Sequence, residues 1–541
     1  MLSSDYRGYK RLLIAVSAAA FLVYGFFLPR NSFVFNSPDE RANAFFAEQV
    51  AQRGTLAAFD PITLNFPEIT PRSFVAVNGF LSPGGFWGLP LVFGAFGRVL
   101  GASFIFLLTP LLAILGVWSL FGLVRTLFDN RVAFWSALIA FLHPAVLFYA
   151  SRNFFPNMAF TALLAITAYF FVSRPFGRTV HQHGSHQFAI AKYLDGALGW
   201  LALALALLIR PSEITWIVLI AMILGLAFWK NLRWPNFFLG LYMAAFFLTI
   251  VFITNNILYL NGWTFGYNFG SLMSSVLPSD NAFFAALSGA VNWLFPFGWH
   301  PLAAIKNVWH FYYILFWFFS FPVLLGLWLF FKEWIHRRLT RPQKWFALSW
   351  IIMTVWLFME YGSWQIQDNP SGQITIGTGY IRYWLPSFFF SAPFIALVIL
   401  KISQSWPLPR LRTVARWAFF SALAIGSVIA VYFRADGLLH TRQFLRESNG
   451  VKTFVLAHTP DDAVIITDTW DKVFFPERHV WPDFDEVESR TLFPKVAAKR
   501  PLYYYGEPLV GENLARFTDE GWRVLKVAAF GNEELARIVR E

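Results

Sequence analysis

Two adjacent carboxylates, Asp39 and Glu40, are the residues of this chain whose type and position best suit catalysis. They belong to the stretch NSPDERANAFFAEQVAQRG, which follows the first long apolar segment. A carboxylate at the border between membrane and water can act as a general base, because it can take a proton from an attacking hydroxyl group. On this stretch alone a structural role is favoured, since acidic residues in a first helical turn complement the helix dipole. Residues elsewhere in the chain shift the balance toward catalysis.

The same stretch has the pattern of a short amphipathic helix. Ser37 and Glu40 have the spacing of a capping box, and Pro38 suits the first helical position. Gly54 suits the C-terminal cap. We therefore expect a helix that lies along a membrane surface with one apolar face. The apolar face comprises Ala42, Phe45, Phe46 and Val50, and the polar side comprises Arg41, Asn43, Glu48, Gln52 and Arg53.

The composition is that of a polytopic membrane protein. Of the 541 residues, 57% are hydrophobic and only 14% are charged, which does not fit a large soluble core. The net charge of +12 does not indicate nucleic-acid binding, because the basic residues lie in short loops between apolar segments, as the positive-inside rule expects. The sequence has no cysteine, so disulfides and thiolate metal sites are excluded.

The apolar segments predict an all-α bundle of about eleven transmembrane helices. The loops assigned to the cytoplasm carry most of the lysines and arginines, which puts the N-terminus inside and the C-terminus outside. The predicted spans are residues 12–28, 103–124, 133–149, 157–172, 194–209, 214–229, 237–255, 310–331, 345–360, 383–400 and 417–433.

Between the first two spans, residues 29–102 form a long outer loop that contains the acidic pair. A second apolar stretch in this loop, residues 84–100, is broken by glycine and proline. We expect it to be an interface helix, because a span there would move every later basic loop to the outer side.

The tail of the chain has a different character. It is charged and mixed, with strand-like runs at 464–467, 501–505 and 523–529 and helical patterns at 438–456 and 486–499. These patterns predict a small α/β domain on the outer face. The chain is therefore expected to consist of a transmembrane domain, residues 1–433, and an extracytoplasmic domain, residues 434–541.

Several polar residues lie at span ends that face outward. Arg152, Arg210 and Arg382 each adjoin a span, and Arg210 has Glu213 beside it. Ionisable groups at membrane depth are costly, so these arginines are candidates for substrate binding. The alternative is a side chain that reaches headgroup phosphate, which is about as well supported for Arg152 and Arg382. His300 lies in a predicted outer loop and by itself fits a structural or interfacial role better.

Two further groups of polar residues favour ordinary roles. His181, His183 and His186 look like a metal cluster, but their loop is polar and lacks a carboxylate. A solvated loop is the favoured interpretation, and no metal site is predicted. Asp468 and Asp471 follow a predicted strand, where turn or helix-cap roles are favoured over catalysis.

Taken together, these features resemble the GT-C superfamily of integral-membrane glycosyltransferases. The closest pattern is that of the aminoarabinose transferase and protein O-mannosyltransferase branch. An acidic pair soon after the first span, in a long outer loop with an amphipathic helix, carries the resemblance. Further stretches match in order: SPGGFWGLPLVFGAFGRVLG, VRTLFDNRVAF, FLHPAVLFYASRNFFPN, LLIRPSE and GYIRYWLPSF.

The resemblance implies a transferase that moves a sugar from a polyprenyl-phosphate donor to an acceptor hydroxyl on the outer face. By this resemblance Asp39 is the base and Glu40 its partner. Arg210 and Arg382 are the first phosphate candidates and Arg152 the next, with Tyr383 and His300 as further substrate-binding candidates. Ser82-Pro83 departs from the Lys-Pro typical of aminoarabinose transferases, so the phosphate contacts and the sugar stay open.

The resemblance also implies partners and a location. We expect a lipid, glycan or protein acceptor, contacts with membrane lipids, no nucleic acid, no required cofactor or metal, and a multi-pass plasma (inner) membrane protein. Two other functions stay open. One is a polymerase or ligase of surface polysaccharide, and the other is a transporter or lipid flippase, whose usual internal repeat is not evident in the sequence.

Overall fold

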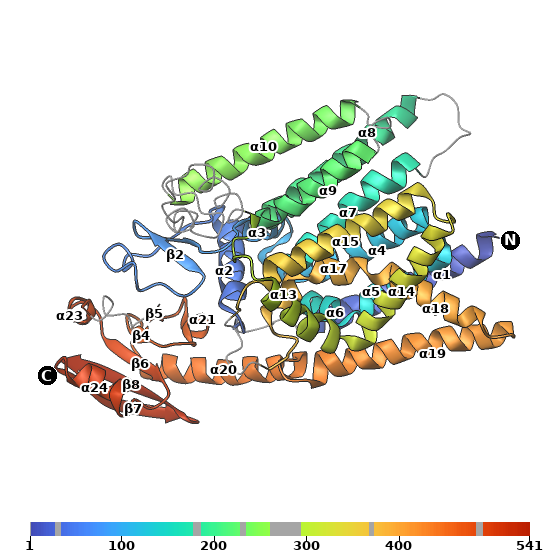
Figure 1. The fold of residues 1–541 in the computed structure, drawn as a ribbon. Helices are drawn as coiled ribbons and strands as arrows, with labels where there is room; N and C mark the ends of the chain where they lie inside the picture. The colour runs from blue at the N-terminus through green and yellow to red at the C-terminus, as the bar shows by residue number, and fades with distance from the viewer. Residues whose placement is uncertain are drawn as a thin grey trace, which may run out of the picture. The chain divides into compact units, whose positions relative to one another are not determined.

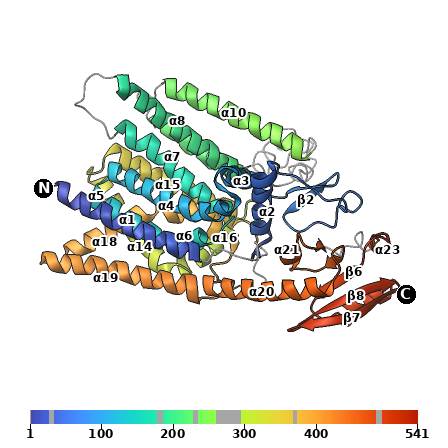
Figure 2. The ribbon, with the colours of Figure 1, turned by 180° about the vertical axis from the view of Figure 1, so that it is seen from behind.

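Figures 1 and 2 show the computed structural model, which describes residues 2–26, 34–176, 186–227, 234–259, 294–366, 373–482 and 491–540. The chain forms two compact units. The first contains Met1–Leu28, Phe106–Phe252 and Asn268–His440, and the second contains Pro29–Ile105, Ile253–Tyr267 and Thr441–Glu541.

The first unit is helical in its described residues. Its α-helices are α1 (Leu2–Phe26), α4 (Leu108–Leu127), α5 (Asn130–Leu142), α6 (Pro144–Ser151), α7 (Pro156–Phe176), α8 (His186–Ile209), α9 (Ile214–Ala227), most of α10 (Trp234–Tyr259), α13 (Pro301–Val308), α14 (Trp317–Ile335), α15 (Arg341–Gly362), α16 (Gly379–Tyr383), α17 (Leu385–Phe390), α18 (Ala392–Gln404) and α19 (Pro409–Val428). The 3₁₀ turn η2 (Pro211–Glu213) and the π-helical turns η4 (Trp309–Ile314) and η5 (Ile429–Phe433) interrupt this series.

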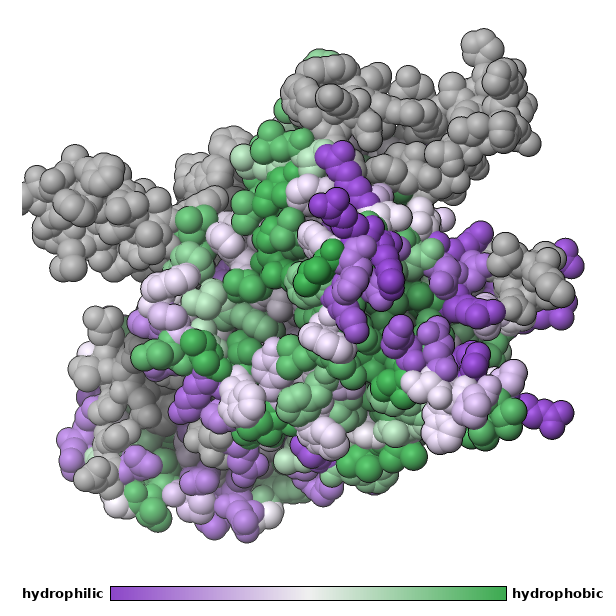
Figure 3. Space-filling view, turned by 45° about the vertical axis from the view of Figure 1, so that its right-hand side comes forward, coloured by the Kyte–Doolittle hydropathy of each residue, from purple (hydrophilic) through white to green (hydrophobic). Residues whose placement is uncertain are grey.

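The chain is a multi-pass membrane protein. Within the described residues, six helices are long and apolar enough to cross a bilayer, and the number rises to eight if each of two bent helix pairs makes one span. Leu22, Leu226 and Ile335 on such helices point outward and are exposed, as lipid-facing side chains would be. Hydrophobic residues also cover large areas of the face drawn in Figure 3. The total of about eleven spans stays a prediction.

Both bent pairs break at a proline. The axis turns by 55° between α5 and α6, where Pro144 opens the second helix. It turns by 115° between α8 and α9, where Pro211 follows Arg210. A proline cannot donate a hydrogen bond to the preceding turn, so the helix ends and a new one starts. The first pair covers one predicted span, residues 133–149, which is therefore bent and not continuous.

In the second unit, the helix that carries the acidic pair is α2 (Pro38–Arg53). Ser37 Oγ accepts the Asp39 N–H at 3.3 Å, and Gly54 closes the helix in the left-handed conformation. These ends confirm the predicted helix. Arg41, which the sequence places on the polar side of this helix, is buried, and its guanidinium carbon lies 6.0 Å from the Phe475 ring centroid. The C-terminal segment therefore covers part of the polar side of α2.

The rest of the outer loop packs on α2. Strands β1 (Ala58–Phe59), β3 (Phe80–Pro83) and β2 (Phe74–Val77) form a small antiparallel sheet in that order. Helix α3 (Gly88–Leu100) follows and has 13 residues. That length gives about 20 Å at 1.5 Å per residue, against a hydrocarbon core of about 30 Å. The length of α3 thus favours the predicted interface helix over a span.

The C-terminal segment builds a five-stranded sheet in the order β5-β4-β6-β8-β7. Strand β4 pairs in parallel with β5 and β6, and β8 pairs antiparallel with β6 and β7. All residues of β4 are buried, as expected for a central strand of a covered sheet. The elements are α20 (Leu438–His458), β4 (Val464–Ile466), α21 (Asp471–Phe474), β5 (His479–Trp481), α23 (Phe493–Ala497), β6 (Leu502–Gly506), α24 (Glu512–Thr518), β7 (Trp522–Phe530) and β8 (Glu533–Arg540).

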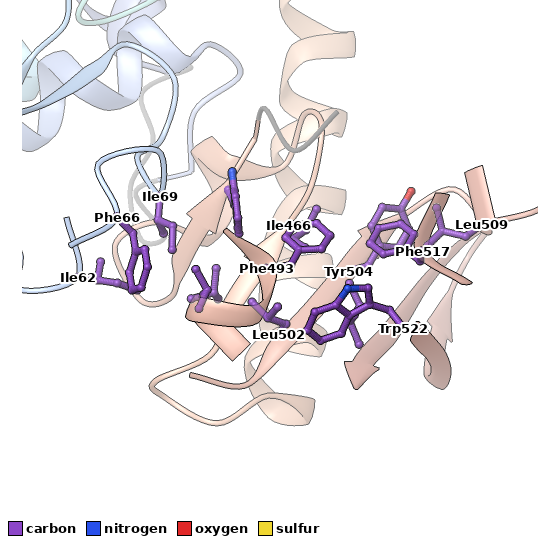
Figure 4. Packing of buried hydrophobic residues seen from close by; sticks show 14 residues of the cluster. Ile62, Phe66, Ile69, Ile466, Phe493, Leu502, Tyr504, Leu509, Phe517 and Trp522 are labelled. Carbon is purple, nitrogen blue, oxygen red and sulfur yellow. The ribbon is translucent and has the colours of Figure 1, made fainter. Parts of the chain in front are cut away.

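One hydrophobic core joins the outer loop to this sheet. Ile62, Phe66 and Ile69 of the loop share a buried cluster with residues of the C-terminal segment such as Ile466 and Phe493. Figure 4 shows the three loop residues at one end of this cluster. Figures 1 and 2 both place α21 next to α2, and the two helices are in contact. The loop that carries the acidic pair thus folds together with residues about 400 positions later. The predicted division of the chain at residue 433 stays a prediction.

Gly94 generates a stability prediction. A Cβ atom at this position of α3 would lie 2.6 Å from the backbone oxygen of Ala47 in α2. We expect Gly94→Ala to force the two helices apart and to cost about 1–3 kcal/mol, measured as a lower midpoint of thermal unfolding in detergent. Gly85→Ala is the matched control, because a Cβ there meets no atom within 4 Å. Equal midpoints for both variants would contradict this packing.

Candidate functional site

Three of the predicted arginines lie on one set of aromatic rings in the first unit. The guanidinium carbons of Arg152 and Arg382 lie 4.7 Å and 5.1 Å from the centroid of Phe155. Those of Arg382 and Arg210 lie 5.1 Å and 5.2 Å from the centroid of Tyr383. These distances are within the range of cation–π attraction. The structure therefore brings together residues that stand far apart in the sequence.

Tyr383 also stacks on Tyr361, with ring centroids 4.4 Å apart and an angle of 7° between the planes. Arg382 Nη2 donates a hydrogen bond to the Tyr383 hydroxyl at 3.3 Å. We call the set Arg152, Phe155, Arg382, Tyr383, Arg210 and Tyr361 the arginine–aromatic cluster. Aromatic faces can hold guanidinium groups in apolar surroundings without neutralising their charge. The cluster therefore gathers three guanidinium groups on shared aromatic faces.

A carboxylate of the same bundle pairs with Arg210. Glu213 Oε1 accepts hydrogen bonds from Arg210 Nε and Nη2 at 2.9 Å and 2.6 Å. The Tyr361 hydroxyl bonds to both groups, at 2.9 Å from Arg210 Nη2 and 2.7 Å from Glu213 Oε1, and Trp216 donates to Glu213 Oε2 at 2.6 Å. The residues Arg210 and Glu213 are only 3% and 1% exposed. This network fixes Arg210 in place and supports the tyrosine stack.

The local sequence explains why each arginine lies at a helix break. Arg152 follows α6 in an extended conformation, and Pro156 starts α7. Arg210 comes directly before Pro211 at the bend between α8 and α9. Arg382 lies in the short helix α16, and α17 begins just beyond it with a proline in its first turn. Each break ends one helix within the bundle, so the side chain points to other helices instead of continuing a lipid-facing stripe.

His300 lies near this cluster but its side chain is exposed. Its backbone N–H donates to Ser363 Oγ at 3.1 Å. In the same loop Phe297 stacks on Trp364 with centroids 4.4 Å apart, and Trp364 lies 5.6 Å from Tyr383. The loop therefore borders the arginine–aromatic cluster, and the role of His300 in binding stays a prediction.

The acidic pair lies in the second unit. Asp39 is half-buried and its Oδ1 accepts a hydrogen bond from Ser73 Oγ at 2.7 Å. Glu40 is only 5% exposed, although an acid in the first turn of a surface helix would normally be solvated. Ser73 adopts a φ of 65°, a region that non-glycine residues rarely occupy. Such strain is typical of functional sites, so the geometry around Asp39 favours more than helix capping.

Several residues of the site were not predicted from the sequence. Some residues discussed in the sequence analysis lie outside the described part of the chain. Ser73 and Tyr361 lie outside the quoted motifs, and Phe155 lies in the stretch FLHPAVLFYASRNFFPN without being singled out. The contacts of all three residues depend on distant segments. Ser82, which replaces the lysine of the related pattern, is buried in β3 opposite Val75. His181 and His183 lie outside the described residues, and the His186 side chain is not described. Within the described ranges, no three His, Cys, Asp or Glu residues gather as metal ligands would.

The comparisons with known proteins bear on the fold. No protein-family model and no curated protein matches the sequence. Among solved structures, the chain is similar to ArnT, the aminoarabinose transferase of Cupriavidus metallidurans, with 14% identity, a TM-score of 0.53 and coverage of 99% of this chain and 98% of that one. A second structure of that protein, bound to undecaprenyl phosphate, aligns with a TM-score of 0.52, 13% identity and 98% coverage of both chains.

A further similar structure is the archaeal oligosaccharyltransferase AglB from Archaeoglobus fulgidus, in complex with an inhibitory peptide and a dolichol-phosphate. It shares 13% identity with this chain, with a TM-score of 0.50 and coverage of 92% of this chain and 69% of that one. Both proteins are GT-C membrane glycosyltransferases. The resemblance to the GT-C superfamily is thus confirmed at the level of the fold.

The buried ion pair generates a stability prediction. Glu213→Gln removes the carboxylate that balances Arg210 inside the bundle, so we expect a loss of about 3 kcal/mol or more, seen as a lower unfolding midpoint in detergent. The control is Glu333→Gln, which removes the partner of Arg338 in a pair whose side chains are 35% and 70% exposed. Exposed pairs contribute less than about 1 kcal/mol. A Glu213→Gln protein as stable as the control would show that Glu213 does not hold Arg210.

Proposed function

We propose that this protein transfers a sugar from a polyprenyl-phosphate donor to an acceptor hydroxyl on the outer face of a plasma membrane. The observation that carries the proposal is the arginine–aromatic cluster in a chain with the GT-C fold. Solved structures of that fold contain undecaprenyl phosphate in ArnT and a dolichol-phosphate in AglB. A lipid phosphate is the anion that this cluster would receive from a bilayer.

The phosphate is assigned to Arg382 and Arg152, with Tyr383 beside them. Arg210 and Arg382 are the first phosphate candidates from the sequence, and Glu213 and Tyr361 hold the guanidinium of Arg210. We therefore assign to Arg210 the task of holding the tyrosine stack on which Arg382 lies. Guanidinium groups form strong charge-assisted hydrogen bonds to phosphate, and they stabilise the negative charge that grows on it as it leaves.

Asp39 is proposed as the general base, with Glu40 as its partner. The acceptor hydroxyl gives its proton to the Asp39 carboxylate while its oxygen attacks the anomeric carbon of the donor sugar. The bond between that carbon and the phosphate oxygen breaks, and the polyprenyl phosphate leaves with the electron pair. The sugar ends up on the acceptor, and the carboxylate returns the proton to solvent.

A second candidate activity is transfer of a preassembled glycan, as by a polysaccharide ligase. The similarity to the oligosaccharyltransferase AglB favours it, although a shared fold does not determine a substrate. Mass analysis of the product distinguishes the two activities, since single-sugar transfer adds one residue and en bloc transfer adds a whole glycan.

Replacing the proposed base generates an activity prediction. We expect Asp39→Asn to lower the transfer rate about 10²- to 10⁴-fold, because a positioned base contributes that much, while binding of undecaprenyl phosphate stays unchanged. Transfer is measured with purified protein in vesicles and a panel of undecaprenyl-phosphate sugars. Glu40→Gln is assayed alongside. A folded Asp39→Asn protein with full transfer would refute the assignment, and lipid scrambling without any transfer by the parent protein would favour a flippase.

The arginines generate a binding prediction. We expect Arg382→Gln and Arg152→Gln each to weaken binding of undecaprenyl phosphate about tenfold or more, since a charge-assisted hydrogen bond contributes about 1.5–3 kcal/mol. Titration calorimetry in detergent measures the dissociation constant. Arg338→Gln is the control, because Arg338 is exposed at the end of another helix. Unchanged affinity in both cluster variants would move the phosphate away from this cluster.

A further inference from the structure

A hydrogen bond from a strained serine orients the proposed base. Ser73 Oγ donates to Asp39 Oδ1 at 2.7 Å. The serine reaches this position in the left-handed conformation, with a φ of 65°. This backbone conformation is sterically unfavourable for a serine but not for a glycine. Something must therefore hold the backbone at Ser73.

Two contacts hold that backbone. Arg72, the preceding residue, donates three hydrogen bonds to the carboxylate of Asp471. The donors are the Arg72 backbone N–H at 2.9 Å, Nε at 3.1 Å and Nη2 at 2.5 Å. Asp471 lies in α21 of the C-terminal segment, and its side chain is 0% exposed. On the other side, Gly84 donates its N–H to the Ser73 carbonyl at 2.9 Å. A Cβ on Gly84 would come within 2.8 Å of the Ser73 carbonyl carbon.

The same C-terminal segment packs against the helix that carries Asp39. The ring of Phe475 lies 5.1 Å from Phe45 of α2 and 4.9 Å from Phe74, which follows Ser73. Burial lowers the pKa of Arg41, while the charges of Glu477 and Glu48 oppose that shift. Helix α2, which carries Asp39, and the segment next to Ser73 therefore both pack against one short stretch near α21. Of the turn or helix-cap roles predicted for Asp471, the cap is not formed, because no side chain caps α21; its carboxylate binds Arg72 instead.

We infer that Ser73 is a positioning residue for Asp39, and that Asp471 of the C-terminal segment sets its position through Arg72. The inference rests on the proposed function, in which Asp39 is the base. It assigns to the C-terminal segment a direct part in orienting the base. The hydrogen bond acts on the chemical step and not on donor binding, so it affects kcat more than KM.

The first test compares two replacements of Ser73. Glycine removes the hydroxyl and also relieves the left-handed backbone, whereas alanine removes the hydroxyl and keeps the strain. We expect both Ser73→Gly and Ser73→Ala to lower kcat about tenfold or more, with the KM for the undecaprenyl-phosphate sugar within twofold of the parent. The unfolding midpoint should fall only for Ser73→Ala. A Ser73→Gly protein with full kcat would overturn the inference, because a merely structural serine is best replaced by glycine here.

The second test addresses the C-terminal carboxylate. We expect Asp471→Asn to lower kcat with little change in KM, because an amide cannot hold the Arg72 guanidinium as strongly. Asp462→Asn is the matched control, since it removes the acid from an exposed pair with Arg500 in the same segment. Equal kcat for the two variants would overturn the role of Asp471.

The third test uses adjacent glycines. Gly84→Ala should push the Ser73 carbonyl away and lower kcat, whereas Gly85→Ala, which meets no atom within 4 Å, should match the parent. This pair keeps the inference falsifiable if Asp471→Asn fails to fold. Equal kcat in the two glycine variants would show that Gly84 does not fix Ser73.

The Asp39→Asn protein separates failure of the inference from failure of the proposed function. If Asp39→Asn retains full transfer, the base assignment fails and takes the inference with it. If Asp39→Asn is inactive while Ser73→Gly is fully active, only the inference fails. If the base assignment and the inference about Ser73 are both right, the Asp39→Asn, Ser73→Gly double variant should be no slower than Asp39→Asn alone. The reason is that the serine acts through the Asp39 carboxylate.

Discussion

The pairing of a buried arginine with a buried glutamate is the interaction on which the helical unit depends. Arg210 and Glu213 stand one helical turn apart at the bend before α9, with almost no exposure. Removing two charges from water is expensive, and only close contact with further hydrogen bonds offsets that cost. Tyr361 and Trp216 supply those bonds. The stack of Tyr361 on Tyr383 also gives Arg382 an aromatic surface.

In the second unit, the contacts that matter hold the Asp39 carboxylate in position at the start of a short helix. Local capping fixes the backbone of α2 through Ser37 and Gly54. It does not fix the direction of the Asp39 side chain, for which a donor must come from elsewhere. Ser73 is that donor, and the C-terminal segment secures it through Arg72 and a shared hydrophobic core. Rigid support of this kind is what a catalytic group requires.

The GT-C fold and the residues on it carry different kinds of information. The fold is shared with two membrane glycosyltransferases at 13–14% identity, a level at which a common architecture says little about substrate. The proposed chemistry rests instead on the arginine–aromatic cluster and the oriented carboxylate.

The sequence alone determined the membrane class, the helix from Pro38 to Arg53 and the arginines at helix ends, because apolar runs, caps and prolines act over a few residues. It also located strands at Val464–Ile466 and Leu502–Gly506. Only the tertiary structure decided that Arg41 is buried, that Asp471 binds Arg72 and that Phe155 and Tyr383 unite three arginines. Those outcomes depend on contacts between segments tens to hundreds of residues apart, and no local pattern encodes such contacts.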